Sequence, residues 1–117
     1  MAGAEQSIIV DVPREDFFEV IRDYERYPEF LPDMKGARIA LRDGPVVDVD
    51  FTLNLVKRIE YRLRLTETAP TGLSWCLVEG MFKRNDGGWT LEELEGGRTR
   101  ATYRIEVAVG VFVPGSI

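Results

Sequence analysis

The chain of 117 residues has the length of one domain, and its 44% apolar and 30% charged residues can form a core under a solvated surface. A net charge of −5 argues against general affinity for DNA or RNA, because that binding needs a basic face. Histidine is absent, which removes the commonest general base near neutral pH and the commonest metal ligand. We therefore predict no metal site and no cofactor.

The N-terminus and the cysteine content indicate a compartment. Residues 1–6 lack the basic region and the apolar core of a signal peptide. No apolar run approaches the ~20 residues that span a bilayer. The single cysteine, Cys76, excludes an internal disulfide and fits a reducing environment. We expect a cytoplasmic protein with no stable membrane anchor.

Residues 7–32 predict one strand and two short helices. Ser7–Val12 is apolar and β-branched, as in a strand, and Pro13 suits the first position of a helix. An apolar stripe at helical spacing follows, made of Phe17, Val20, Ile21 and Tyr24. Tyr27 precedes a proline and leaves the helical conformation, so a second, very short helix is predicted over Pro28–Leu31.

Beyond Gly36 the apolar period changes to two, which is typical of strands. The predicted strands are Arg38–Leu41, Val47–Leu55, Ile59–Leu65, Leu73–Val78, Trp89–Leu91 and Thr99–Val109. Turn sequences are expected at Asp43-Gly44, Asp86–Gly88 and Gly96-Gly97. Together with the first strand they predict an antiparallel meander with one dry and one wet face. The chain is interpreted as a single α+β domain over residues 1–117.

Two motifs resemble a known family. Asp23–Pro32 is similar to the signature of the polyketide cyclase/dehydrase and coenzyme Q-binding branch of the START-like (SRPBCC) superfamily. Val78–Lys83, leading to Gly87–Trp89, is similar to that branch's Gly-Pro-Phe and Gly-Trp pair, with Met81 in place of the usual proline. The resemblance covers nearly the whole chain. It implies a helix-grip fold, in which a curved antiparallel sheet of about seven strands and two short N-terminal helices enclose an apolar cavity.

The same resemblance implies a long C-terminal helix across the cavity, yet the sequence ends at Val113–Ile117, where that helix would begin. We expect this helix to be absent from the chain. A truncated form of a longer protein is the first explanation. The alternative is that a ligand or another chain, such as a homo-oligomer partner, covers the open sheet face, because an apolar face above about a few hundred Å² usually marks an interface.

The inward-facing positions of the strands supply a candidate site for a hydrophobic small molecule. Tryptophan and tyrosine tips in apolar surroundings could orient a ligand head group, although periodicity alone would equally describe an ordinary core. The candidate ligand-binding residues are Phe51, Leu53, Tyr61, Leu63, Trp75, Leu77, Phe82, Trp89, Tyr103 and Ile105. Phe30 and Leu31 are expected with Phe82 at the cavity mouth, or else as a hydrophobic staple between helix and sheet.

Charged residues of the opposite parity are interpreted as a solvated face. Asp48 and Asp50 are expected to pair across strands with Arg62 and Arg64 rather than to act as acid and base. Cys76 shares this outward parity and has no histidine to activate it, so no nucleophile is predicted.

Three functions remain open, because similar proteins include quinone-binding proteins, aromatase/cyclases and a toxin that blocks ribosomal subunit association. The first is binding, transport or presentation of a lipid, an isoprenoid quinone or a polyketide. The second is polyketide aromatase/cyclase activity through Tyr61 and Tyr103, and the third is a ribosome- or protein-interaction module using the arginine-rich face. We favour the first and predict no catalytic residue, since an ordinary tyrosine titrates near about 10.

Overall fold

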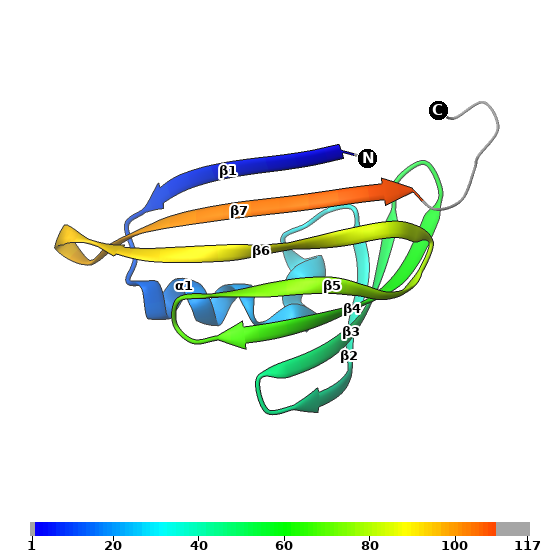
Figure 1. The fold of residues 1–117 in the computed structure, drawn as a ribbon, viewed down its shortest axis with the longest axis horizontal. Coiled ribbons are helices and arrows are strands. Elements are labelled where there is room, and N and C mark those ends of the chain that lie inside the picture. Colours follow the sequence, from blue (N-terminus) through cyan, green and yellow to red (C-terminus); the bar gives the residue numbers. More distant parts are fainter. Residues whose placement is uncertain (1, 110–117) are drawn as a thin grey trace.

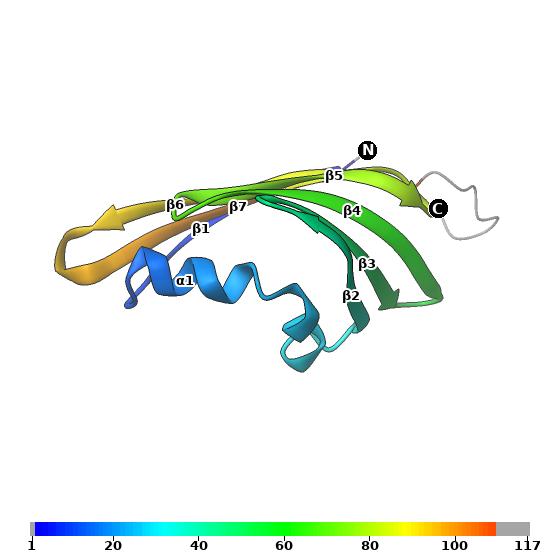
Figure 2. The same cartoon turned by 90° about the horizontal axis from the view of Figure 1, so that it is seen from below.

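Seven strands form one antiparallel sheet that arches over two short helices (Figure 1, Figure 2). The computed structural model describes residues 2–109, so the expectation for residues 113–117 lies outside the described part. The elements are β1 (Ala2–Val10), α1 (Arg14–Ile21), the 3-10 helix η1 (Tyr24–Glu29), β2 (Met34–Asp43), β3 (Val46–Asn54), β4 (Arg58–Thr68), β5 (Gly72–Gly80), β6 (Phe82–Leu94), the 3-10 turn η2 (Glu95–Gly97) and β7 (Arg98–Val109). The predicted α+β architecture is confirmed.

The strand order β1-β7-β6-β5-β4-β3-β2 is a meander from β2 to β7 with β1 added along β7. β1 begins at Ala2 rather than at Ser7 because it pairs with β7 over its whole length, from Ala2↔Val107 to Val10↔Thr99. Figure 2 shows α1 and η1 beneath the concave side of the arch. The helices thus leave the convex side of the sheet uncovered.

Residue parity separates the two faces of β3 and β4 as expected. The register pairs Asp48 with Arg64 and Asp50 with Arg62, on the convex face. The intervening residues point to the concave side and form the core, which includes Val47, Val49, Phe51, Tyr61, Leu63 and Leu65. One alternating sequence therefore builds an apolar and a charged surface on opposite sides of the same strands.

The turn predicted at Asp86–Gly88 is wrong, because β6 runs unbroken through these residues and the reversal of the chain occurs at Met81. Gly87 is required by close packing between strands. A Cβ atom there would collide with the backbone oxygen of Arg104 and lie 2.9 Å from Cζ2 of Trp75. The turn predicted at Gly96-Gly97 is confirmed, with φ of 77° and 73° that favour glycine.

The helical boundaries also differ from the prediction. α1 ends at Ile21, and Asp23 leaves the helical region with φ −89° and ψ 67°. Tyr24 therefore starts η1 instead of ending α1, and its fully buried side chain donates a 2.7 Å hydrogen bond to Glu67. Phe18 takes the buried place that the periodicity assigned to Val20, which is 55% exposed.

Candidate functional site

A groove of about 600 Å³ lies between the concave face of the sheet and the α1–η1 segment. Its walls come from β1, α1, η1 and the strands β2 to β7. No charged side chain is among the lining residues, and most are aliphatic or aromatic. The groove can therefore hold a neutral, apolar molecule without desolvating an ion.

Most of the sequence-predicted site residues meet in this groove. Those that line it are Phe51, Tyr61, Leu63, Trp75, Trp89, Tyr103 and Ile105. Phe30 and Leu31 also line it and are 55% and 40% exposed, a position that suits the expected mouth.

Leu53, Leu77 and Phe82 do not line the groove, although they pack against the buried cluster. Leu53 lies at the end of β3, between Met34 and Ile59 on the neighbouring strands. Leu77 pairs with Leu63 directly beside the register shift that interrupts the β4–β5 ladder. Phe82 packs edge-on behind Tyr61, with ring centroids 4.9 Å apart. Parity alone could not separate lining residues from those packed behind them.

Several lining residues were not predicted from the sequence. The lining also includes Gln6, Ile8, Phe17, Val20, Ile21, Tyr27, Met34, Leu65 and Asn85. Leu65 shares the inward parity of β4, and Phe17 belongs to the apolar stripe of α1, so both carried a signal. The sequence pattern contained no such signal for Asn85, because the prediction placed this residue beside a turn at Asp86–Gly88 that the structure does not have.

Aromatic rings line the groove in two groups. On one side Trp89 packs against Phe17 and Tyr103, with ring centroids 5.3 Å and 5.0 Å apart. On the other side Phe51 stacks on Tyr61 at 5.6 Å and on Tyr27 at 5.9 Å. These contacts fix rings of α1, η1 and the sheet against one another, so the groove is largely preformed.

Glu67 anchors the elbow between α1 and η1 to the sheet. Its carboxylate accepts hydrogen bonds from the Tyr24 hydroxyl at 2.7 Å, from Arg22 at 3.0 Å and from Arg42 at 3.2 Å. Burial alone would raise the pKa of this carboxyl, but the three donors together outweigh it and hold the pKa below its ordinary value. A further hydrogen bond holds the two helices together, because the Tyr27 hydroxyl of η1 donates to the backbone oxygen of Ile21 at the end of α1.

Burial raises the pKa of the groove tyrosines Tyr27, Tyr61 and Tyr103 above the ordinary value. All three side chains therefore stay neutral at physiological pH and can donate or accept a hydrogen bond. They are weaker acids than free tyrosine and are not poised to exchange protons near pH 7.

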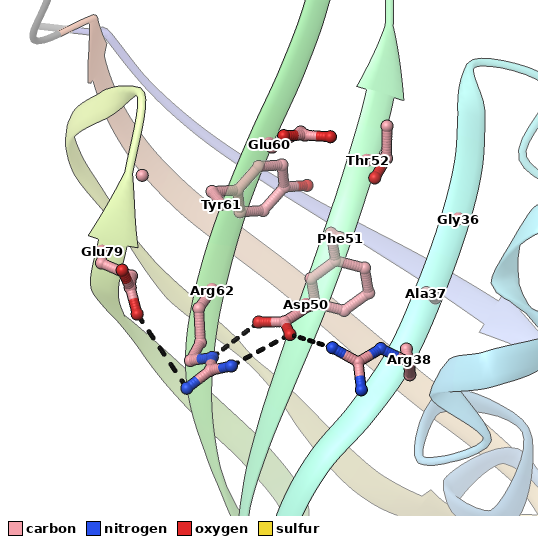
Figure 3. A pocket seen from close by; sticks show the side chains of 11 residues that line it. Gly36, Ala37, Arg38, Asp50, Phe51, Thr52, Glu60, Tyr61, Arg62 and Glu79 are labelled. Carbon is pink, nitrogen blue, oxygen red and sulfur yellow. Dashed lines mark hydrogen bonds and ion pairs between the residues drawn. The ribbon is translucent and has the colours of Figure 1, made fainter.

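A second hollow, of about 470 Å³, lies on the convex face and has a different character (Figure 3). Arg62 contacts Asp50 at 2.6 Å and Glu79 at 3.9 Å, and Arg38 contacts Asp50 at 3.0 Å. Asp48 pairs with Arg64 at 2.8 Å next to it, so the predicted cross-strand pairs are confirmed. These charges already have partners, and the hollow is a less suitable ligand site than the apolar groove.

None of the helices within residues 2–109 is long and apolar enough to cross a membrane. The same residues contain no cluster of three or more histidine, cysteine, aspartate or glutamate side chains that could hold a metal ion.

Solved structures share this fold. An aromatase/cyclase, Zhui, from Streptomyces sp. R1128 superimposes with a TM-score of 0.85 over 96% of this chain and 70% of its own, at 15% identity. A START superfamily protein from Mycobacterium smegmatis gives a TM-score of 0.84 over 97% of this chain and 81% of its own, at 19% identity. At these identities the likeness establishes the START-like fold alone.

Sequence comparison adds relatives and a family. The Ribosome association toxin RatA of Vibrio cholerae is 29% identical over 109 residues, 91% of this chain and 74% of the toxin. The Persistence and stress-resistance toxin PasT of Escherichia coli O6:H1 is 29% identical over 111 residues, 91% of this chain and 68% of the toxin. The family model for polyketide cyclase/dehydrase and lipid transport matches residues 10–117. Since this match spans nearly the whole arch and its groove, the chain belongs to the polyketide cyclase/dehydrase and lipid transport family of the START-like superfamily.

Proposed function

We propose that the protein binds a neutral hydrophobic small molecule, such as a lipid, an isoprenoid quinone or a polyketide, in the concave groove. The observation that carries this proposal is an apolar groove of about 600 Å³ without a charged lining residue. That volume is within the range of small-molecule sites, about 300–1,000 Å³. Each ~100 Å² of apolar ligand surface removed from water would contribute about 2.5 kcal/mol.

The tyrosines favour binding over cyclase chemistry. A base that removes a proton from a polyketide chain works best with a pKa near the operating pH. Burial moves the pKa of Tyr61 and Tyr103 in the opposite direction, above the ordinary value. Both hydroxyls remain suited to orienting a ligand by hydrogen bonding.

The first experiment looks for a bound molecule and then for binding. Native mass spectrometry and organic extraction of the purified protein should reveal a co-purified apolar compound, and quinones should raise its melting temperature. Protein free of any extractable compound and with no thermal shift would contradict the proposal.

A variant that fills the groove tests its location. Ile105 lines the groove from β7, so Ile105→Trp should lower quinone affinity by about tenfold or more. Ile9→Trp is the matched control, because Ile9 is 54% exposed on β1 and is not part of the lining. Equal affinity in both variants would place the ligand elsewhere.

Association with ribosomes is a second candidate, favoured by the similarity to the Ribosome association toxin RatA of Vibrio cholerae. In this chain the arginines of the convex face are held by acidic partners, Arg62 by Asp50 and Arg64 by Asp48. Ribosome binding through this face would require these arginines to exchange an aspartate for a phosphate.

Cosedimentation with ribosomal subunits separates the two candidates. If the second holds, Arg62→Gln combined with Arg64→Gln abolishes cosedimentation and leaves quinone binding intact. Arg58→Gln serves as the control, since the Arg58–Glu60 pair is exposed and remote from Asp48. Wild-type protein that fails to cosediment at low salt would remove this candidate.

A further inference from the structure

Asn85 is a buried polar residue in an otherwise apolar part of the groove. It is 5% exposed and belongs to the groove lining. Buried polar side chains are normally hydrogen-bonded. The amide nitrogen of Asn85 is not among the fully enclosed side-chain atoms that lack a partner, so this atom keeps access to the groove.

The orientation of the Asn85 amide is fixed by Trp75. The indole Nε1 of Trp75 lies 3.1 Å from the Asn85 side-chain oxygen. An indole N–H can only donate a hydrogen bond, so Asn85 must turn its oxygen, not its nitrogen, toward Trp75. Among the described residues none accepts a hydrogen bond from the Asn85 amide nitrogen.

Gly87 makes this arrangement possible. It faces Trp75 in the β5–β6 register, and a Cβ atom on it would lie only 2.9 Å from Cζ2 of Trp75. The indole can therefore lie across β6 and reach Asn85, which is two residues away on the same face of the strand. Tyr103 packs against the same indole, with ring centroids 5.7 Å apart, and holds it in place.

We propose that the Asn85 amide nitrogen donates a hydrogen bond to the polar end of the ligand, so that the groove selects neutral apolar molecules with an acceptor oxygen such as a ketone, quinone or ester carbonyl. This inference rests on the proposed binding function and narrows its ligand class. Asn85 differs from the groove tyrosines, whose hydroxyls rotate and can both donate and accept. With its oxygen engaged by Trp75, Asn85 offers N–H groups to a ligand and therefore discriminates.

Fluorenone and fluorene test this selection. They share one apolar ring frame and differ by a carbonyl in place of a methylene group, and equilibrium dialysis measures both dissociation constants. In Asn85→Asp at neutral pH, the carboxylate still accepts from Trp75 but cannot donate. We expect the ratio of the fluorene to the fluorenone dissociation constant to fall about three- to tenfold relative to wild type, as for loss of one neutral hydrogen bond.

Three comparisons keep the result interpretable. Asn54→Asp, an identical change at an exposed position of β3, should leave the ratio at the wild-type value. Acidification should restore the ratio in Asn85→Asp, because a protonated carboxyl donates again, and a purely structural role would not produce this recovery. Asn85→Ala removes the donor without burying a charge and should lower the ratio if Asn85→Asp does not fold.

The outcomes separate the two proposals. An unchanged ratio in Asn85→Asp and Asn85→Ala, with both probes still bound, overturns the role of Asn85 and leaves the groove as a binding site. Failure of wild-type protein to bind either probe or the quinones overturns the proposed function and this inference together.

Discussion

The two faces of the sheet solve different physical problems with the same strands. On the concave side β3 and β4 present Phe51, Tyr61 and Leu63 to an uncharged groove. On the convex side they present aspartates and arginines that neutralise one another across the strands. Successive residues along each strand point to opposite faces of the sheet. A slip of one residue in register would therefore exchange the two faces. The groove thus depends on register as much as on composition.

The largest difference in stability is expected between alanine substitutions of two glycines on opposite faces of the sheet. In Gly87→Ala the new methyl group would collide with the backbone oxygen of Arg104 and would lie 2.9 Å from Cζ2 of Trp75. We therefore expect unfolding, or a decrease of about 3 kcal/mol or more in the free energy of unfolding. In Gly36→Ala, on the convex face, the nearest atom is Oγ1 of Thr52 at 3.6 Å, and the loss should stay below about 1 kcal/mol. Urea unfolding measures both. Similar stability in the two variants would contradict the close packing inferred on the concave side.

Charge removal should have unequal effects on the two sides. Glu67→Gln leaves Arg22 and Arg42 without their carboxylate, and we expect a loss of about 2 kcal/mol, reduced from the value for a fully buried pair because both arginines are about one-third exposed. Glu60→Gln, in an exposed pair with Arg58, should cost less than about 0.5 kcal/mol. The free energy of unfolding of each variant provides the comparison.

The pH dependence of the Glu67 effect has a defined sign. Its carboxyl pKa is lower in the folded protein than the ordinary 4.5, so its stabilising contribution is present above about pH 4.5 and is lost as the pH falls through the folded pKa. The stability difference between wild type and Glu67→Gln should therefore shrink in acid. A difference that grows below pH 4.5 would contradict this assignment.

A smaller effect is expected from groove tyrosines in alkali. Burial raises the pKa of Tyr61 above its ordinary 10.0, so its contribution to stability is complete below about pH 10 and declines as the pH rises further. Tyr61→Phe has no hydroxyl to ionise, so its stability should not show this decline. The free energy of unfolding of the variant minus that of wild type should therefore be about 1 kcal/mol larger near about pH 11 than near about pH 8. Parallel stability curves of the two proteins would show that Tyr61 ionises freely in the folded state.

The smallest expected effect concerns salt. Since the groove lining contains no charged residue, fluorenone affinity should change less than about twofold between about 0.05 and 0.5 M sodium chloride. Cosedimentation through the convex arginines, if it occurs, should instead weaken steeply over the same range. Dialysis at several salt concentrations checks the first statement. A tenfold change would mean that a charged group contacts the probe.

Alternation and turn chemistry were sufficient to predict the sheet, because strand parity depends on local sequence. Val47 to Leu65 could be assigned to faces residue by residue, and the cross-strand pairs of Asp48 and Asp50 followed from that assignment. The double glycine at 87 and 88 misled the prediction, because glycine serves close strand packing as well as turns. Because of that error the strand predicted here was too short, and Asn85 was not assigned to a strand.

Other parts of the site depend on contacts between distant segments. Glu67 has the inward parity of β4, but only the folded chain brings Arg22, Tyr24 and Arg42 to its carboxylate. Phe82 has an apolar side chain near the groove, yet it packs edge-on against Tyr61 and does not line the groove. Such distinctions arise from tertiary packing and have no local signal in the sequence.

The β5–β6 register extends from Gly72↔Thr90 to Trp75↔Gly87 and does not continue toward Met81, whereas β5 and β6 each keep pairing with their outer neighbours. Backbone amides that face each other across this gap lack a ladder to protect them, so hydrogen–deuterium exchange should be faster there than along β3 and β4. Because these segments of β5 and β6 pair with one neighbouring strand only, we expect local opening here before the rest of the sheet opens. A ligand bound at Asn85 should then slow hydrogen–deuterium exchange more in residues 76–86 than in any other part of the sheet.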